Sequence, residues 1–86
     1  MKIKEIIWTN KFERELKKVK DASFLEKVKK RIRKIIQNPN FGKPLRYGLR
    51  GEKTIWIKPY RLIFKVEEDK LILLRLEHRK KVYRVY

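Results

Sequence analysis

The spacing of apolar residues changes once along this chain, and that change limits the folds it can adopt. Phe12, Leu16 and Val19 recur at helical spacing, and so do six apolar residues between Phe24 and Ile36. From residue 54 onward, apolar and polar side chains instead alternate, as they do in half-buried strands. A chain of 86 residues has room for one domain. We therefore expect residues 1–86 to form a single domain in which two helices accompany a sheet.

Two amphipathic helices are predicted in the first half. The first begins after Thr9 or Asn10, and the second after Asp21 or Ser23, because these side chains can accept a hydrogen bond from the first helical turn. The second helix should end near Asn38-Pro39-Asn40, since the residue before proline avoids the helical conformation. The short connection predicts an antiparallel helical hairpin. Its narrow apolar stripes need a sheet to lie on.

The predicted strands cover residues 3–8, 54–58, 60–67 and 70–77, with a further short strand an open alternative at residues 82–85. The segment 70–77 is apolar on both faces, which is typical of a central strand. Residues 40–53 form a long loop containing glycine, proline and basic residues, and such loops are often functional. The expected fold class is α+β, with a helical hairpin packed on one face of a mainly antiparallel four- to five-stranded sheet.

Positive charge dominates the composition. The chain has 26 Lys and Arg against 10 Asp and Glu, a net charge of +16. Such a field attracts polyanions, and nucleic acid is the commonest partner of a small basic domain. Acidic protein is the second candidate and an anionic membrane the third. No segment resembles a signal peptide or a membrane span, so we expect a cytoplasmic protein.

The ionisable side chains favour chemistry without a metal cofactor. The chain has no cysteine and one histidine, and its only acidic cluster, Glu67-Glu68-Asp69, falls in a predicted turn. Cleavage of RNA needs no metal when the ribose 2′-OH attacks the adjacent phosphate. That reaction requires a base, an acid and cations that stabilise the phosphate. Arginine suits the last task because its planar fork matches phosphate geometry.

Three groups of residues are candidates for this chemistry. The first is Arg61, within a predicted strand; the alternative is an ordinary solvated arginine. The second is the segment from Glu77 to Tyr83, which includes His78 as a proton switch and Arg79, Lys80 and Lys81 as cations; the alternative is a basic tail anchored by Tyr83 and Tyr86. The third group could neutralise an RNA backbone or form a solvated loop, and comprises Lys43, Arg46, Tyr47, Arg50, Lys53 and Lys58.

The remaining basic and aromatic residues receive smaller roles. The helical charges, such as Lys29-Lys30-Arg31 and Arg33-Lys34, are interpreted as the solvated face of an amphipathic helix with a minor steering effect. Trp8 and Trp56 are interpreted as core or edge packing.

Four segments carry a resemblance to a known family, namely Pro44-Leu45, Leu49-Arg50-Gly51, Tyr60-Arg61-Leu62-Ile63-Phe64 and His78-Arg79-Lys80-Lys81-Val82-Tyr83. In this order and at this length, the chain resembles the RelE/ParE toxin superfamily, close to the RelE ribonucleases and their archaeal relatives. The resemblance implies a toxin that enters the ribosomal A site and cuts messenger RNA there.

The resemblance also implies roles for individual residues. Arg61 corresponds to the strand arginine that stabilises the phosphate, and Arg79 to a second arginine. Tyr83 corresponds to a tyrosine that transfers a proton or orients the RNA. Lys58, and less closely Lys53, corresponds to the lysines of the preceding strand, but Pro59 shortens that connection and leaves the general base open. His78 would orient rather than catalyse.

Members of this superfamily are usually bound by an antitoxin. The resemblance therefore implies an acidic, RelB-like antitoxin in a toxin–antitoxin heterocomplex, together with the ribosome and messenger RNA as partners. Helix-in-groove or strand-addition contacts would hold the antitoxin. Two other functions stay open: a ParE-like toxin that inhibits gyrase and cuts nothing, and an RNA-binding protein without catalysis.

Overall fold

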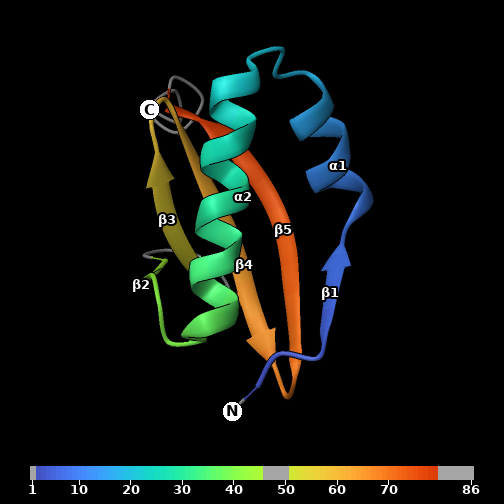
Figure 1. Cartoon of the computed structure of the whole chain (residues 1–86), viewed down its shortest axis with the longest axis vertical. Coiled ribbons are helices and arrows are strands. Elements are labelled where there is room, and N and C mark those ends of the chain that lie inside the picture. Colours follow the sequence, from blue (N-terminus) through green and yellow to red (C-terminus); the bar gives the residue numbers. More distant parts are fainter. Residues whose placement is uncertain (1, 46–50, 80–86) are drawn as a thin grey trace.

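The computed structural model describes residues 2–45 and 51–79, which form two helices and a five-stranded sheet (Figure 1). The sheet order is β1-β5-β4-β3-β2, with β1 parallel to β5 and every other pair antiparallel. The α+β prediction is confirmed. In chain order the elements are β1 (Glu5–Trp8), α1 (Asn10–Lys17), α2 (Ala22–Gln37), β2 (Lys43–Pro44), β3 (Lys53–Ile57), β4 (Tyr60–Glu67) and β5 (Lys70–His78).

Side-chain caps fix where both helices begin. The Thr9 Oγ1 accepts a hydrogen bond from the Phe12 N–H at 3.2 Å and donates one to the Leu73 carbonyl at 2.7 Å. The Asp21 carboxylate accepts from the Ser23 N–H at 3.0 Å and the Phe24 N–H at 3.3 Å. Thr9 and Asp21 are therefore the caps, each the first of the two predicted alternatives. α2 ends at Gln37, just before Asn38 and Pro39, as predicted.

The outer strands differ from the predictions. The first strand begins at Glu5 and not at Ile3, because its partner strand begins at Lys70, which pairs with Glu5; the Lys4 N–H donates at 2.8 Å to the carbonyl of Asp69, in the turn before that strand. The expected loop contains the two-residue strand β2, in which Lys43 pairs with Thr54. A strand of two residues is too short to show an alternating pattern, so the sequence did not predict it. Pro44 is tolerated in β2 because β2 is an edge strand. Residues 82–85, where a further strand was considered, lie outside the described residues.

Both helices pack on the same face of the sheet. Phe12 of α1 and Phe24 and Val28 of α2 join one core cluster with Leu62 of β4 and Leu73 of β5, among others. Figure 1 shows α2 crossing in front of the central strands, with α1 beside β5. β5 lies between β1 and β4, which confirms the predicted central strand.

A β-bulge decides which side chains of β5 face the helices. Ile63 pairs with Arg75, whereas the next residue, Phe64, pairs with Leu73. Residues three positions apart on a regular strand point to opposite faces. Because β5 has one extra residue at the bulge, Leu73 and Leu76 both face the core. Arg75 consequently projects from the face that the helices leave uncovered, as Arg61 does on β4.

Gly42 lies where a side chain would collide with the core. Its φ is 100°, and a Cβ built there would lie 3.0 Å from the Phe64 Cζ atom. We expect Gly42→Ala to lower the free energy of unfolding by about 1–3 kcal/mol, measured by urea denaturation. Gly51→Ala is the matched control, because its φ is 88° but a Cβ there meets nothing within 4 Å. Equal losses in both variants would show that the contact with Phe64 has no effect.

Candidate active site

Three of the predicted site residues lie in the region where the β3–β4 turn approaches the end of β5, although Arg61 does not line the hollow that Lys58 and Arg79 share. Lys58 and Pro59 form the turn, and Arg61 follows on β4. The Arg79 N–H donates to the Pro59 carbonyl at 2.7 Å, which holds the end of β5 against the turn. Trp56, Lys58, Pro59 and Arg79 line a hollow of about 310 Å³. We call this region, from Trp56 to Arg61 with Glu77 and Arg79, the β3–β4 corner.

A carboxylate on the neighbouring strand holds the Arg61 side chain in place. Arg61 pairs with Glu77 in the strand register, and its Nε and Nη2 atoms lie 2.9 and 2.8 Å from the Glu77 Oε1. Only 21% of its side chain is exposed. Within the described part of the chain, Nη1 has no hydrogen-bond partner. Arg61 is thus an oriented cation with one nitrogen left for an anion, and not a freely solvated arginine.

Glu77 is held in turn by a second arginine. The Arg75 Nε lies 3.3 Å from the Glu77 Oε2, and its Nη2 lies 3.1 Å from the Glu52 Oε1. The Glu52 side chain is 5% exposed. Burial alone would lower the pKa of Arg75, but hydrogen bonds and charge from Glu52, then from Glu77, raise that pKa above its ordinary value. The four residues, Glu52, Arg61, Arg75 and Glu77, form what we call the ion-pair network.

His78 lies on the other face of the sheet from Arg61. Its ring makes an edge contact with the Tyr60 ring, with centroids 4.9 Å apart, and Tyr60 lies against Phe24 of α2 at 5.0 Å. Successive strand residues point to opposite faces, so the His78 imidazole and the Arg61 guanidinium diverge. The structure places His78 in packing that supports the corner from the helix side.

The predicted loop lysines lie far from the corner. Lys43 belongs to β2, and Lys53 begins β3, where its ammonium group donates to the Pro39 carbonyl at 3.4 Å. Lys53 and Lys58 are five strand positions apart, which corresponds to about 16 Å. The structure therefore does not bring Lys43 or Lys53 together with Arg79. The remaining predicted site residues lie outside the described residues: Arg46, Tyr47, Arg50, Lys80, Lys81 and Tyr83.

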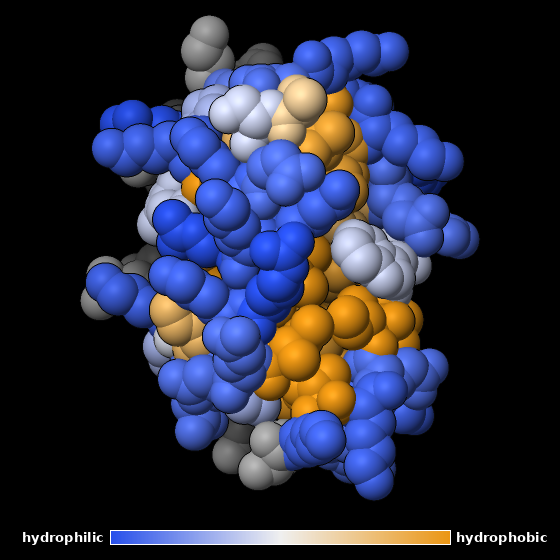
Figure 2. Space-filling view, viewed as in Figure 1, coloured by the Kyte–Doolittle hydropathy of each residue, from blue (hydrophilic) through white to orange (hydrophobic). Residues whose placement is uncertain are grey.

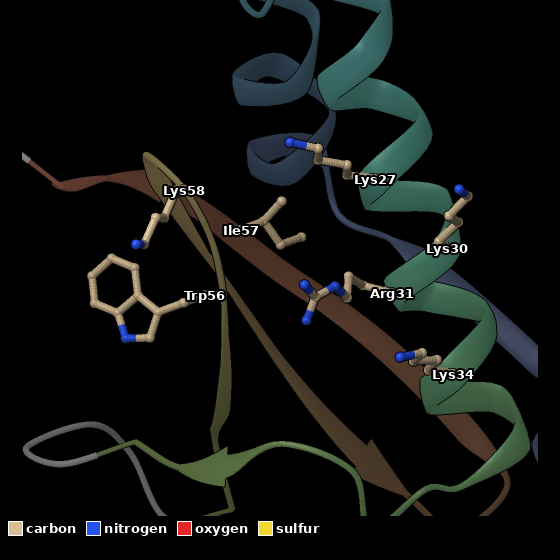
Figure 3. A pocket seen from close by; sticks show the side chains of 7 residues that line it. All are labelled: Lys27, Lys30, Arg31, Lys34, Trp56, Ile57 and Lys58. Atoms are coloured by element: carbon tan, nitrogen blue, oxygen red, sulfur yellow. The ribbon is translucent and has the colours of Figure 1, made fainter.

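A second hollow, which the sequence reading missed, extends from the corner to α2. It measures about 500 Å³ and is lined by Lys27, Lys30, Arg31, Lys34, Trp56, Ile57 and Lys58 (Figure 3). We call it the α2–β3 groove. Trp56 is 42% exposed, so it is not a core residue. The helical spacing of the four cations was the signal in the sequence that could have indicated this groove. The sequence alone does not reveal that this side of α2 faces β3.

The corner suits the binding of a phosphate. Lys58, Arg61 and Arg79 supply cations, and arginine can donate two parallel hydrogen bonds to phosphate oxygens. Within residues 2–45 and 51–79, no three His, Asp or Glu side chains cluster in a way that could hold a metal ion. None of the helices in these ranges is long and apolar enough to cross a membrane.

Known proteins resemble this chain over almost its full length. The family model for the ParE toxin of type II toxin–antitoxin systems matches residues 6–83. The RelB–RelE antitoxin–toxin complex from Methanococcus jannaschii contains a similar structure, with a TM-score of 0.72, 24% identity, and coverage of 93% of this chain and 98% of that one. The RelBE2 toxin–antitoxin complex from Mycobacterium tuberculosis gives a TM-score of 0.73 and 26% identity, covering 92% and 94%.

A third similar structure comes from the chromosomal ParDE system of Pseudomonas aeruginosa, with a TM-score of 0.65, 19% identity, and coverage of 88% of this chain and 96% of that one. No curated protein sequence matches the chain significantly. The similar structures thus include both RelE and ParE systems.

Proposed function

Because the chain belongs to the ParE toxin family of type II toxin–antitoxin systems, within the RelE/ParE superfamily, we propose that it is a cytoplasmic, ribosome-dependent endoribonuclease that cuts messenger RNA in the A site. The observation that carries this proposal is the β3–β4 corner. There Glu77 orients the Arg61 guanidinium, whose Nη1 has no hydrogen-bond partner within the described residues, and Lys58 and Arg79 line the neighbouring hollow. A toxin that only binds a protein target has no need of such a phosphate site.

The proposed reaction uses the RNA itself as the nucleophile. The ribose 2′-oxygen attacks the adjacent phosphorus, the bond to the 5′-oxygen breaks, and the product carries a 2′,3′-cyclic phosphate. One proton leaves the 2′-OH and one is delivered to the departing 5′-oxygen. Arg61 and Arg79 stabilise the negative charge that develops on the phosphate. Lys58 and Tyr83 are our candidates for the proton transfers, and His78 orients the corner through Tyr60.

We further propose an acidic, RelB-like antitoxin as the inhibitory partner. The similar structures from M. jannaschii and M. tuberculosis are toxin–antitoxin complexes. Figure 2 shows an apolar strip between α2 and β1, and the half-buried Ile6 and Ile36 lie at the edge of the core. The apolar face of an amphipathic helix fits such a strip. The net charge of +16 would speed capture of an acidic chain.

The rival proposal is a ParE-like toxin that inhibits gyrase without cutting RNA. Primer extension on translated messages, after induction without an antitoxin, separates the two. We expect codon-linked cuts with the wild-type chain, and neither cuts nor growth arrest with a folded Tyr83→Phe variant. Growth arrest without cuts would favour the gyrase inhibitor. Unimpaired growth would favour a non-catalytic RNA-binding protein.

A further inference from the structure

We propose that the α2–β3 groove is a track for single-stranded RNA, in which the α2 cations bind phosphates and the Trp56 indole stacks on a base. This inference deepens the proposed function and rests on it for the destination of the strand, the β3–β4 corner. The sequence reading gave these helical cations only a minor steering effect.

The cations form one row along the helix. Lys27, Lys30, Arg31 and Lys34 follow the spacing i, i+3, i+4, i+7, so they share one face over about 10 Å of helix. In the described part of the chain none of the four forms an ion pair, whereas Lys29, on another side of α2, lies 3.5 Å from Glu26. The groove lining contains no acidic residue. Within the described residues, no carboxylate pairs with this row, whereas the arginines of the ion-pair network on the sheet are paired with glutamates. We call the row of Lys27, Lys30, Arg31 and Lys34 the rail.

Trp56 joins this rail to the corner. Its neighbours Ile55 and Ile57 are buried, at 6% and 2% exposure, so they anchor the strand while the indole stays exposed. Trp56 and Lys58 line both the α2–β3 groove and the hollow that contains Arg79. Figure 3 shows Arg31 and Lys34 extending from α2 toward β3, with Trp56 and Lys58 beside each other across that strand. A polyanion on the rail is thus led to the corner.

An exposed aromatic face that lies across one strand from a row of cations suits single-stranded nucleic acid, because an unpaired base can stack on the ring while phosphates of the same strand, passing around the edge of β3, meet the cations. In a duplex the bases are already stacked inside and cannot reach the indole. An acidic peptide would satisfy the cations, and it could also pair with the edge of β3, since β2 covers only Lys53 and Thr54. It offers no base to stack on Trp56, so the exposed indole favours RNA.

The rail is tested with a 2′-O-methyl oligouridine, which the proposed reaction cannot cleave. In the Lys27→Gln/Lys34→Gln variant, the dependence of log affinity on log salt should become less steep by about 1.4, the contribution of two phosphate contacts to a single strand. The Lys29→Gln/Arg33→Gln variant removes two charges from the same helix outside the groove, and we expect it to keep the wild-type slope. Equal slopes in the two variants would overturn the rail.

The stacking is tested in a Trp8→Phe background, where Trp56 is the only tryptophan. The oligouridine should quench its fluorescence, and Trp56→Leu should weaken binding by about tenfold. A polyglutamate of equal charge should bind more weakly and leave the fluorescence unchanged. Unquenched Trp56, or polyglutamate binding as tightly as the oligouridine, would overturn the inference. The probe cannot be cleaved, so its binding is measured separately from the reaction. If messenger RNA is cleaved but the groove does not bind the probe, only the track is contradicted. If the groove binds the probe but messenger RNA is not cleaved, only the nuclease proposal is contradicted.

Discussion

Replacing Arg61 with alanine should slow messenger RNA cleavage by about 10²–10³-fold, the usual cost of removing one preorganised donor from a developing negative charge. The fold should persist, because Glu77 keeps its contact with Arg75. Arg61→Lys retains the charge but cannot reproduce the planar fork, so it should recover little activity. The measurement is the rate of cleavage by purified toxin on translating ribosomes, with circular dichroism to confirm folding.

Lys65→Ala is the matched control for Arg61. Lys65 is a cation on the same strand and the same face, paired with Glu67 at 2.6 Å, but it lies toward the other end of β4. We expect it to leave cleavage unchanged. Glu77→Gln should lower kcat more than it raises KM, because Glu77 positions Arg61 and does not itself touch the RNA. If Arg61→Ala and Lys65→Ala cut RNA equally well, the corner is not the site of the reaction.

The largest effect on stability is expected from Glu52. Its carboxylate is buried and binds two nitrogens of Arg75, at 3.1 and 3.4 Å. Burial opposes the charged form of Arg75. Because an arginine side chain does not lose its proton in proteins, Arg75 stays charged when Glu52 is removed and then lacks its main partner. Glu52→Ala should therefore lower the free energy of unfolding by about 2–3 kcal/mol, less than the usual 3–5 for a broken buried pair because Glu77 remains as a partner.

Glu67→Ala is the control for this prediction. It removes the carboxylate of the exposed pair with Lys65, and exposed pairs contribute little because water and salt screen them. Urea denaturation of both variants gives the comparison. Similar midpoints for Glu52→Ala and Glu67→Ala would mean that the ion-pair network does not stabilise the fold.

Local signals in the sequence predicted most of the fold. The alternation in β4 located the strand at Tyr60–Glu67, and capping chemistry narrowed the start of α2 to Asp21 or Ser23, of which the structure has Asp21. The two-residue strand β2 gave no such signal, because it exists only through its pairing with Lys53 and Thr54. The periodicity of apolar residues therefore predicts only those helices and strands that are long enough to repeat it.

The site was predicted less completely, because its geometry depends on strand register. Arg61 was identified from its segment, but its partner Glu77 lies 16 residues away, and Glu52 lies 23 residues from Arg75. The bulge between Ile63 and Phe64 sets which residues of β5 share the face of Arg61. His78 was grouped with Arg79 by sequence proximity, although its side chain faces the helices.

The chemistry at the corner is tested most directly by the ends of the RNA fragments. Purified toxin should be incubated with translating ribosomes, and the fragments isolated and analysed by mass spectrometry. We predict a 2′,3′-cyclic phosphate on the upstream fragment, present with the wild-type chain and absent with Arg61→Ala. Fragments ending in a 3′-hydroxyl, or equal cleavage by the wild-type and Arg61→Ala chains, would contradict attack by the 2′-OH at the β3–β4 corner.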